Sequence, residues 1–266
     1  IVICLLACSM AATAQKNGGI STQMIQQMEK QYAANPSSKA LFNAIASNSI
    51  DDLSKNFKNQ GPVDTNFSTE TPKQSIHDQK QSGRCWMFSG LNVLRSNFAK
   101  QHNDTLAVEF SQDYLFFYDQ LEKSNLFLQG IIDTRKLPME DRKVDWLFSN
   151  PIGDGGQFTG VSNLIMKYGV VPSEAMPETY SANNTSAMRS QLSLILREGG
   201  LKLRAAKDKD VQALKVSILK DVYRVLALCL GVPPTEFTWR KDGKTYTPQE
   251  FYQQYRQGEK AEQLIA

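Results

Sequence analysis

Apolar residues recur every three or four positions in several stretches of the chain, which is the spacing of one face of an α-helix. Residues 20–58 show this period, with Met24 and Met28 four positions apart, and Pro36 divides the stretch into separate helices. We expect these helices to form an N-terminal helical cover. Residues 59–84 lack the period, and their Gly, Pro, Thr and other polar residues predict an extended loop.

Further helices are expected after this loop. The first begins at Cys85 and carries apolar residues at the helical spacing for about four turns. A second covers residues 111–128, where the Ser111 hydroxyl can cap the start. A third covers residues 157–168, and residues 207–230 show the clearest apolar stripe of the C-terminal part.

Strand patterns are few. Residues 237–240 and 244–247 flank Asp242 and Gly243, which is a hairpin pattern, and a helical segment follows from Thr247. A glycine cluster at residues 153–156 separates two of the expected helices. The patterns therefore predict a chain with helices in the majority and few strands.

The composition is that of a soluble globular protein. Hydrophobic residues make up 41% of the 266 residues and charged residues 21%, which excludes a disordered tail, a collagen-like repeat and a multi-span membrane protein. The 30 Lys and Arg are interleaved with 27 Asp and Glu, so nothing predicts a nucleic-acid or membrane-surface partner. Neither a His/Cys ligand cluster nor a phosphate-binding glycine loop is present, so we expect no metal and no organic cofactor.

Residues 1–14 are apolar and uncharged and end in a small-x-small pattern from Ala12 to Ala14, as secretory signal peptides do. A bilayer span needs about 20 apolar residues, so this stretch is too short for a transmembrane segment. We expect export to the periplasm or the medium, with the mature domain covering residues 15–266. As an alternative, the residues before Cys8 roughly resemble a lipobox, which would make Cys8 a lipid-anchored N-terminus.

The mature chain then keeps two cysteines, Cys85 and Cys229, and has no disulfide framework. Cys229 lies on the apolar stripe of its helix and is expected to be a buried thiol. Cys85 instead follows a glycine-containing loop at the first turn of a helix. Free backbone N–H groups and the positive end of the helix dipole favour an anion there, so the position predicts a stabilised thiolate.

Acyl transfer to a thiolate also requires hydrogen-bond donors for the oxyanion that forms on the attacked carbonyl. The backbone N–H of Cys85 can supply one donor, and the side-chain amide of Gln79 can supply the other. Gly83 lets the loop bend close to a substrate, and Trp86 can anchor the helix. Cys85 is thus the candidate nucleophile and Gln79 the candidate oxyanion donor, the alternative being a buried structural cysteine at a loop–helix junction.

The nucleophile segment consists of Gln79, Ser82, Gly83, Arg84, Cys85, Trp86, Met87 and Phe88. It resembles the active-site segment of papain-like cysteine peptidases, in particular the branch of bleomycin hydrolase and bacterial aminopeptidase C. Further segments resemble the same branch in the same order, so the resemblance covers roughly residues 40–256; these segments are 110–119, 122–125, 154–158, 167–172 and 237–239. The resemblance implies an α+β, papain-like fold, of which this chain holds mostly the helical nucleophile lobe with few strands. It also implies that Gly155 and Gly156 form the cleft wall along which the substrate backbone runs, whereas without the family a plain turn would be a serious alternative.

A cysteine peptidase needs a base, usually a histidine oriented by Asn or Asp. His102 follows Cys85 by 17 residues, which is about 25 Å along a helix. His77 lies two residues before Gln79 and would compete with that donor. In the papain-like family the His and Asn come from a second, β-rich lobe, so we expect this chain to be the N-terminal part of a longer protein and inactive alone.

The resemblance further implies a cysteine-type aminopeptidase with a peptide substrate, assembled as a homo-oligomer and commonly a hexamer. In that branch a C-terminal tail restricts the cleft to exposed N-terminal residues of the substrate. Endopeptidase and amidohydrolase activities stay open from the residues alone. A function of a different class is a non-catalytic binding or assembly module that retains the nucleophile lobe.

Overall fold

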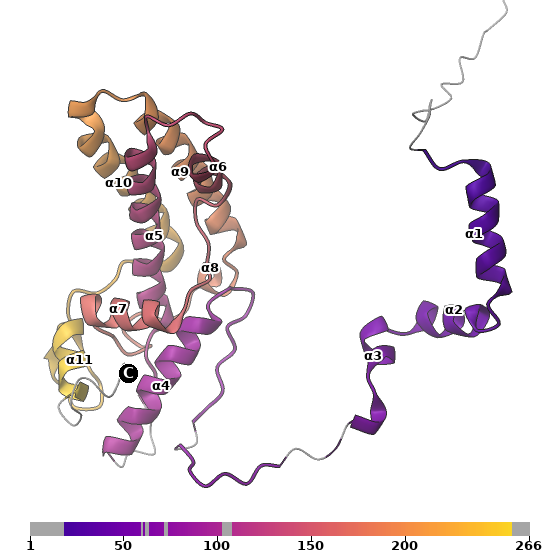
Figure 1. The fold of residues 1–266 in the computed structure, drawn as a ribbon. Helices are drawn as coiled ribbons and strands as arrows, with labels where there is room; N and C mark the ends of the chain where they lie inside the picture. Colours follow the sequence, from indigo (N-terminus) through magenta and orange to yellow (C-terminus); the bar gives the residue numbers. More distant parts are fainter. Residues whose placement is uncertain (1–18, 60, 62–63, 72–73, 103–107, 257–266) are drawn as a thin grey trace, which may run out of the picture. The chain divides into compact units, whose positions relative to one another are not determined.

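A computed structural model of the chain describes residues 19–59, 61, 64–71, 74–102 and 108–256 (Figure 1). The chain divides into two compact units, residues 1–68 and residues 69–266. The expected signal peptide at residues 1–14 lies outside the described residues.

The first unit consists of short helices, as its apolar period predicts. They are α1 (Thr22–Ala34), α2 (Ser38–Ser47), α3 (Ile50–Ser54) and a 3₁₀ turn, η1 (Phe57–Asn59). The Ser21 hydroxyl caps α1 by accepting a hydrogen bond from the Met24 amide, at 3.2 Å. Asn35 and Pro36 separate α1 from α2, which confirms the predicted break. Apolar side chains of α1, such as Met24 and Met28, are exposed, so the expected packing of a helical cover is not seen in this unit.

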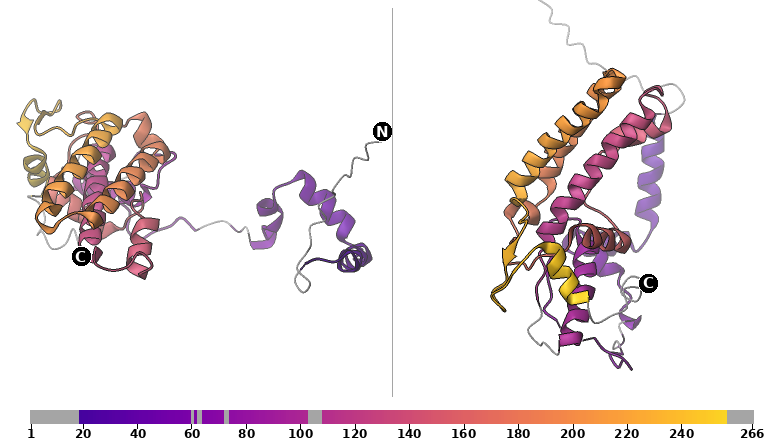
Figure 2. Two further views of the ribbon diagram at one scale, coloured as in Figure 1. Left: turned by 90° about the horizontal axis from the view of Figure 1, so that it is seen from above. Right: turned by 90° about the vertical axis from the view of Figure 1, so that its left-hand side faces the viewer.

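The second unit contains the buried apolar core. Its helices are α4 (Cys85–His102), α5 (Gln112–Thr134), α6 (Arg142–Ser149), α7 (Phe158–Tyr168), α8 (Tyr180–Asn183), α9 (Ser186–Ala205), η2 (Asp208–Asp210), α10 (Val211–Leu230) and α11 (Pro248–Arg256). Its strands are β1 (Phe237–Thr238) and β2 (Thr245–Tyr246), paired antiparallel with Phe237 opposite Tyr246. The long helices α5, α9 and α10 pack against one another, and α7 lies across one end of α5 and also contacts α4 and α11 (Figures 1 and 2).

The central helix α5 is buried on more than one face because helices pack around it. Phe116, Phe117 and Leu128 are completely inaccessible to solvent. The neighbouring α9 approaches α10 closely at Gly199, where a Cβ atom would lie 2.8 Å from the Ile218 side chain. Small residues at this crossing therefore allow the two helices to pack without a gap.

Most of the predicted elements are confirmed, with changes at their ends. The helix predicted over 111–128 continues to Thr134, and the one predicted from 207 begins at Val211, because residues 208–210 form the η2 turn instead. The helices α6, α8 and α9 were not predicted from the sequence. Within the described part of the chain, no helix is long and apolar enough to cross a membrane.

Candidate active site

Cys85 is the first residue of α4, as the sequence predicts, and it is exposed. The three residues that follow it, Trp86, Met87 and Phe88, are all buried in the core, with exposed fractions of 8%, 0% and 7%. The first turn of α4 is therefore anchored in the core by these side chains, while Cys85 is exposed to solvent. This arrangement excludes the alternative of a buried structural cysteine.

The loop before Cys85 closes on itself through two hydrogen bonds. The Gln79 side-chain amide donates to the carbonyl oxygen of Ser82 at 2.5 Å, and the Ser82 hydroxyl donates to the Gln79 carbonyl at 2.6 Å. Between them Lys80 adopts a left-handed conformation with φ of 55°, and its amide donates to the Asp78 carboxylate. An amide group has two N–H donors, so Gln79 keeps one for a ligand after binding Ser82.

Arg84 ties this loop to a distant segment of the chain. Its guanidinium is fully buried and makes a bidentate pair with Glu178, at 3.0 and 2.7 Å. Its Nε donates to the Ser82 hydroxyl at 2.9 Å, and the guanidinium carbon lies 5.2 Å from the ring centres of both Phe88 and Phe116. Breaking such a buried pair leaves an uncompensated charge, so Arg84 and Glu178 fix the loop together.

Asp113 lies in the first turn of α5 and is completely buried. Burial raises the pKa of its carboxyl group to about 8, the charge of Glu178 adds to this, and Arg84 opposes it. At pH 7 most of this carboxyl group is therefore protonated, which limits the negative charge around the buried Arg84.

The glycine cluster lies directly against the nucleophile segment. Trp86 Nε1 donates to the Asp154 carbonyl at 2.8 Å, and the Asp154 carboxylate accepts from the Gly83 amide at 3.3 Å and the Thr185 hydroxyl at 2.5 Å. A Cβ atom on Gly83 would lie 2.9 Å from Asp154 Cβ. The loop and the glycine cluster therefore form one connected structure.

Gly155 and Gly156 differ in the space available for a Cβ atom. A Cβ atom on Gly156 would lie 2.5 Å from Trp86 Cε2, whereas one on Gly155 would meet nothing within 4 Å. Neither residue has a positive φ angle, so the backbone conformation by itself does not require glycine at either position. Both are exposed, and the backbone of Gly156 makes no hydrogen bond within the described residues.

Neither histidine lies near Cys85 along α4. His77 Nε2 lies 3.1 Å from a Glu109 carboxylate oxygen, and both ring nitrogens lie 3.2 Å from Arg95 Nη1. Arg95 is ten residues beyond Cys85 on α4, which is about 15 Å along the helix axis. His102 is the last residue of α4, at the end opposite Cys85.

Several residues of the site were missed from the sequence, namely Asp119, Lys123, Asp154 and Glu178. Asp119 and Lys123 form an i,i+4 ion pair of 2.7 Å on α5, a spacing that was visible in the sequence. Burial raises the pKa of Asp119 to about 6, against the opposing effect of Lys123. Cys229, predicted to be buried, is partly exposed at the end of α10.

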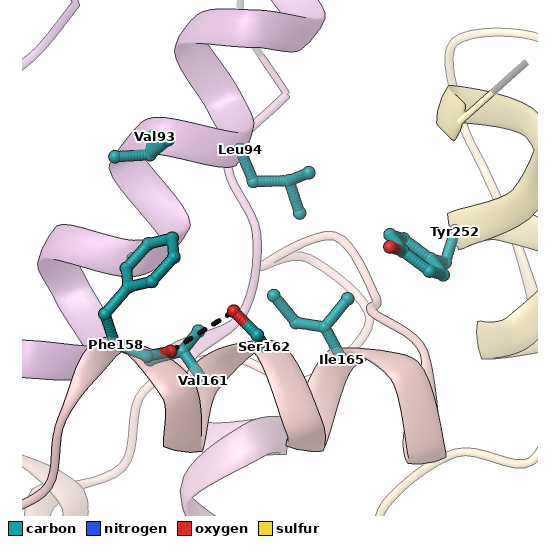
Figure 3. A pocket seen from close by; sticks show the side chains of 8 residues that line it. Val93, Leu94, Phe158, Val161, Ser162, Ile165 and Tyr252 are labelled. Atoms are coloured by element: carbon teal, nitrogen blue, oxygen red, sulfur yellow. Dashed lines mark hydrogen bonds between the residues drawn. The ribbon is translucent and has the colours of Figure 1, made fainter. Parts of the chain in front are cut away.

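A separate apolar hollow lies between α4, α7 and α11 (Figure 3). The side chains of Val93, Phe158, Ile165 and Tyr252 line it, and the Ser162 hydroxyl donates to the Phe158 carbonyl at 3.2 Å. Among the described residues, no cluster of three or more His, Cys, Asp or Glu side chains could hold a metal ion.

The exposed cysteine at the first residue of α4, the hydrogen-bonded loop before it and the glycine cluster packed against Trp86 together match the arrangement expected of a papain-like lobe. Residues 19–265 match the Peptidase C1-like family, and the chain belongs to this family. The predicted α+β, papain-like fold is thereby confirmed, with the described part mostly the helical lobe.

Among curated proteins, the chain is 38% identical to aminopeptidase C of Lactobacillus delbrueckii subsp. lactis over 249 residues, covering 89% of the chain and 55% of the relative. It is 40% identical to aminopeptidase C of Lactobacillus helveticus over 249 residues, with the same shares covered. Among solved structures, PepW from Lactobacillus rhamnosis HN001 matches with a TM-score of 0.78 and 37% identity, covering 90% of this chain and 56% of that one. The chain thus spans about half the length of the curated relatives it matches.

Proposed function

We propose that the natural protein is a cysteine-type aminopeptidase that hydrolyses peptide bonds through a thioester on Cys85. The observation that carries the proposal is the exposed Cys85 at the start of α4, preceded by a loop in which the Gln79 amide is hydrogen-bonded to the Ser82 carbonyl. Relatives named aminopeptidase C, at 38% and 40% identity, support the reaction class.

In this mechanism the Cys85 sulfur attacks the carbonyl carbon of the scissile amide. The resulting oxyanion accepts hydrogen bonds from the Cys85 backbone N–H and from the second N–H of Gln79. Collapse of this intermediate breaks the C–N bond, the amine leaves with a proton, and the acyl group stays on sulfur. Water then hydrolyses the thioester and restores the thiol.

Both half-reactions need a base that also returns a proton to the leaving amine. His77 is engaged with Glu109 and Arg95, and His102 lies at the far end of α4. We therefore assign the base to a histidine of the natural protein other than these two, oriented by an asparagine, as the family resemblance implies.

Gly155 and Gly156 are proposed to bind the backbone of the peptide ligand. Both are exposed next to Trp86, which directly follows the nucleophile. The backbone amide and carbonyl of Gly156 have no partner within the described residues, so they can pair with an extended peptide as a strand edge does.

The test uses the natural full-length protein with an aminoacyl arylamide and the same substrate acetylated at its amino group. An aminopeptidase cleaves the first and not the second, whereas an endopeptidase tolerates the acetyl group. Cys85→Ala is expected to abolish cleavage, and Cys229→Ala, the matched control, is expected to retain it. Full activity of Cys85→Ala would refute the mechanism, and an inactive wild type would favour the non-catalytic binding module.

We also propose that the protein forms a homo-oligomer, as its branch of the family does, with a hexamer as the specific expectation. Exposed apolar side chains on α1 and α2, among them Met28 and Phe42, are consistent with burial against another subunit. Sedimentation equilibrium of the natural protein measures its mass. A mass of one subunit at micromolar concentration would contradict this proposal.

Export is proposed from residues 1–14 alone, with cleavage after Ala14. Cell fractionation followed by mass spectrometry of the mature N-terminus tests it. A mature chain beginning at Gln15 supports a cleaved signal peptide, whereas one beginning at a lipid-modified Cys8 supports the lipoprotein alternative. An uncleaved cytoplasmic protein would refute both.

A further inference from the structure

Three consecutive backbone carbonyls of the glycine cluster accept hydrogen bonds from side chains of α4 and α5. The Gly153 carbonyl accepts from Lys123 Nζ at 3.0 Å and from Gln120 Nε2 at 3.2 Å. The Asp154 carbonyl accepts from Trp86 Nε1 at 2.8 Å, and the Gly155 carbonyl accepts from Lys123 Nζ at 2.7 Å. One lysine thus holds the carbonyls on both sides of Asp154.

All three N–H donors of the Lys123 ammonium group have acceptors. It carries three N–H donors, and its three acceptors are the Asp119 carboxylate at 2.7 Å and the carbonyls of Gly153 and Gly155. Its nitrogen also lies 5.2 Å from the ring centre of Trp86. The side chain of Asp119 is only 8% exposed, so this carboxylate anchors the lysine to α5.

These bonds fix the orientation of the peptide groups that precede Gly156. A carbonyl held by Lys123 cannot rotate toward the cleft, so the peptide planes at Gly153 and Gly155 have one orientation each. The Gly156 amide and carbonyl, which have no partner within the described residues, follow directly in the chain. The Gly155 carbonyl and the Gly156 N–H belong to one planar peptide group, so Lys123 sets the direction of this N–H and the starting point of the Gly156 carbonyl.

We propose that Lys123 is a positioning residue of the substrate-binding wall, which holds the Gly153 and Gly155 carbonyls so that the Gly156 backbone is aligned with the peptide ligand. The inference rests on the proposed binding role of Gly155 and Gly156. Lys123 itself does not touch the reacting atoms, so it acts on peptide binding and not on the chemistry at Cys85.

The experiment compares Lys123→Met with Lys167→Met in the natural full-length protein. Lys167 also pairs with a carboxylate of α5, that of Glu122, but makes no contact with the glycine cluster. We expect Lys123→Met to raise KM for a peptide substrate about tenfold while kcat changes less than about threefold, and Lys167→Met to leave both constants unchanged. Lys123→Gln keeps two N–H donors, so its KM is expected to lie between those of the wild type and Lys123→Met.

A second measurement does not depend on turnover. Iodoacetamide alkylates an accessible thiol, and a tripeptide with a reduced, non-cleavable bond protects Cys85 by occupying the wall. The unprotected alkylation rate is expected to be the same in wild type and Lys123→Met, while half-protection of the variant needs about ten times more peptide. A structural role alone would instead change the unprotected rate or the Tm without shifting the protection curve.

Unchanged KM and unchanged protection in a folded Lys123→Met would overturn the inference, as would a fall in kcat with a slower alkylation rate. If the wild type binds the tripeptide but does not cleave peptides, the proposed function fails while the protection curves still test Lys123. If the wild type neither cleaves nor is protected, both proposals are wrong.

Discussion

Replacing Gly156 with alanine tests whether the glycine wall and the nucleophile helix are in direct contact. The new Cβ would lie 2.5, 2.7 and 2.8 Å from Cε2, Cδ2 and Cζ2 of Trp86. Carbon atoms prefer separations of about 3.5–4.0 Å, so the ring or the backbone must move by about 1 Å. Trp86 is buried and hydrogen-bonded to the Asp154 carbonyl, so it has little freedom to move.

Overpacking of this kind costs about 1–3 kcal/mol. For a domain of about 200 residues this corresponds to a fall in Tm of roughly 2–12 °C. Gly153→Ala is the matched control, because a Cβ there meets nothing within 4 Å. Its stability is expected to stay within about 0.5 kcal/mol of the wild type.

The assay is urea unfolding of both variants, followed by circular dichroism and by tryptophan fluorescence. Fluorescence adds a local readout because Trp86 is the ring that must move. Equal unfolding free energies of Gly156→Ala and Gly153→Ala, whether both are lowered or both unchanged, would refute the close packing of Gly156 on Trp86.

Four further predictions follow from the same contacts. Gln79→Ala is expected to lower kcat about 10²–10³-fold in steady-state kinetics, as loss of an oxyanion donor does, and an unchanged kcat would contradict that role. His77→Gln is expected to keep kcat within about threefold, because His77 is engaged by Glu109 and Arg95; loss of activity in a folded variant would contradict the exclusion of His77 from the chemistry. Burial raises the folded-state pKa of Asp113 from 3.8 to about 8, so between these values the folded state binds more protons than the unfolded chain and the free energy of unfolding falls as pH rises. Asp113→Asn should reduce the difference in unfolding free energy between pH 5 and pH 8, measured by urea unfolding. An unchanged difference would refute the raised pKa. Gly169→Ala should lower the Tm more than Gly231→Ala, because both glycines have positive φ but only at Gly169 would a Cβ meet backbone, 2.2 Å from the Pro248 carbonyl oxygen; equal losses would contradict this.

The nucleophile segment was predictable because its information is local. A glycine loop, a helix start at Cys85 and an apolar period after it are all visible within a few residues of one another. The Ser111 cap of α5 was readable for the same reason, and the structure confirms it with a 3.1 Å hydrogen bond from the Tyr114 amide.

The unpredicted parts depend on contacts between residues far apart in the chain. Helix α9 has buried residues at the helical spacing, such as Leu192 and Leu196, but Gly199 and Gly200 interrupt its pattern. Those glycines are explained only by the close approach of Ile218 and Phe148. Sequence patterns within one element do not report such neighbours.

The same limit applies to the site. Glu178 lies 94 residues from Arg84, and Lys123 lies 30 residues from Gly153. From the sequence alone, a glutamate or a lysine is expected to lie on the surface without a specific partner. Only the fold shows that one neutralises a buried guanidinium and the other holds the backbone of the glycine wall.

Trapping the acyl-enzyme tests the central claim most directly. The natural full-length protein is mixed with an aminoacyl ester, quenched in acid within milliseconds, digested and mapped by mass spectrometry. The mechanism predicts the mass of the acyl group on the peptide that contains Cys85, and no such adduct in Cys85→Ala. Turnover of the ester with the acyl group on another residue, or with Cys85→Ala as active as the wild type, would contradict it.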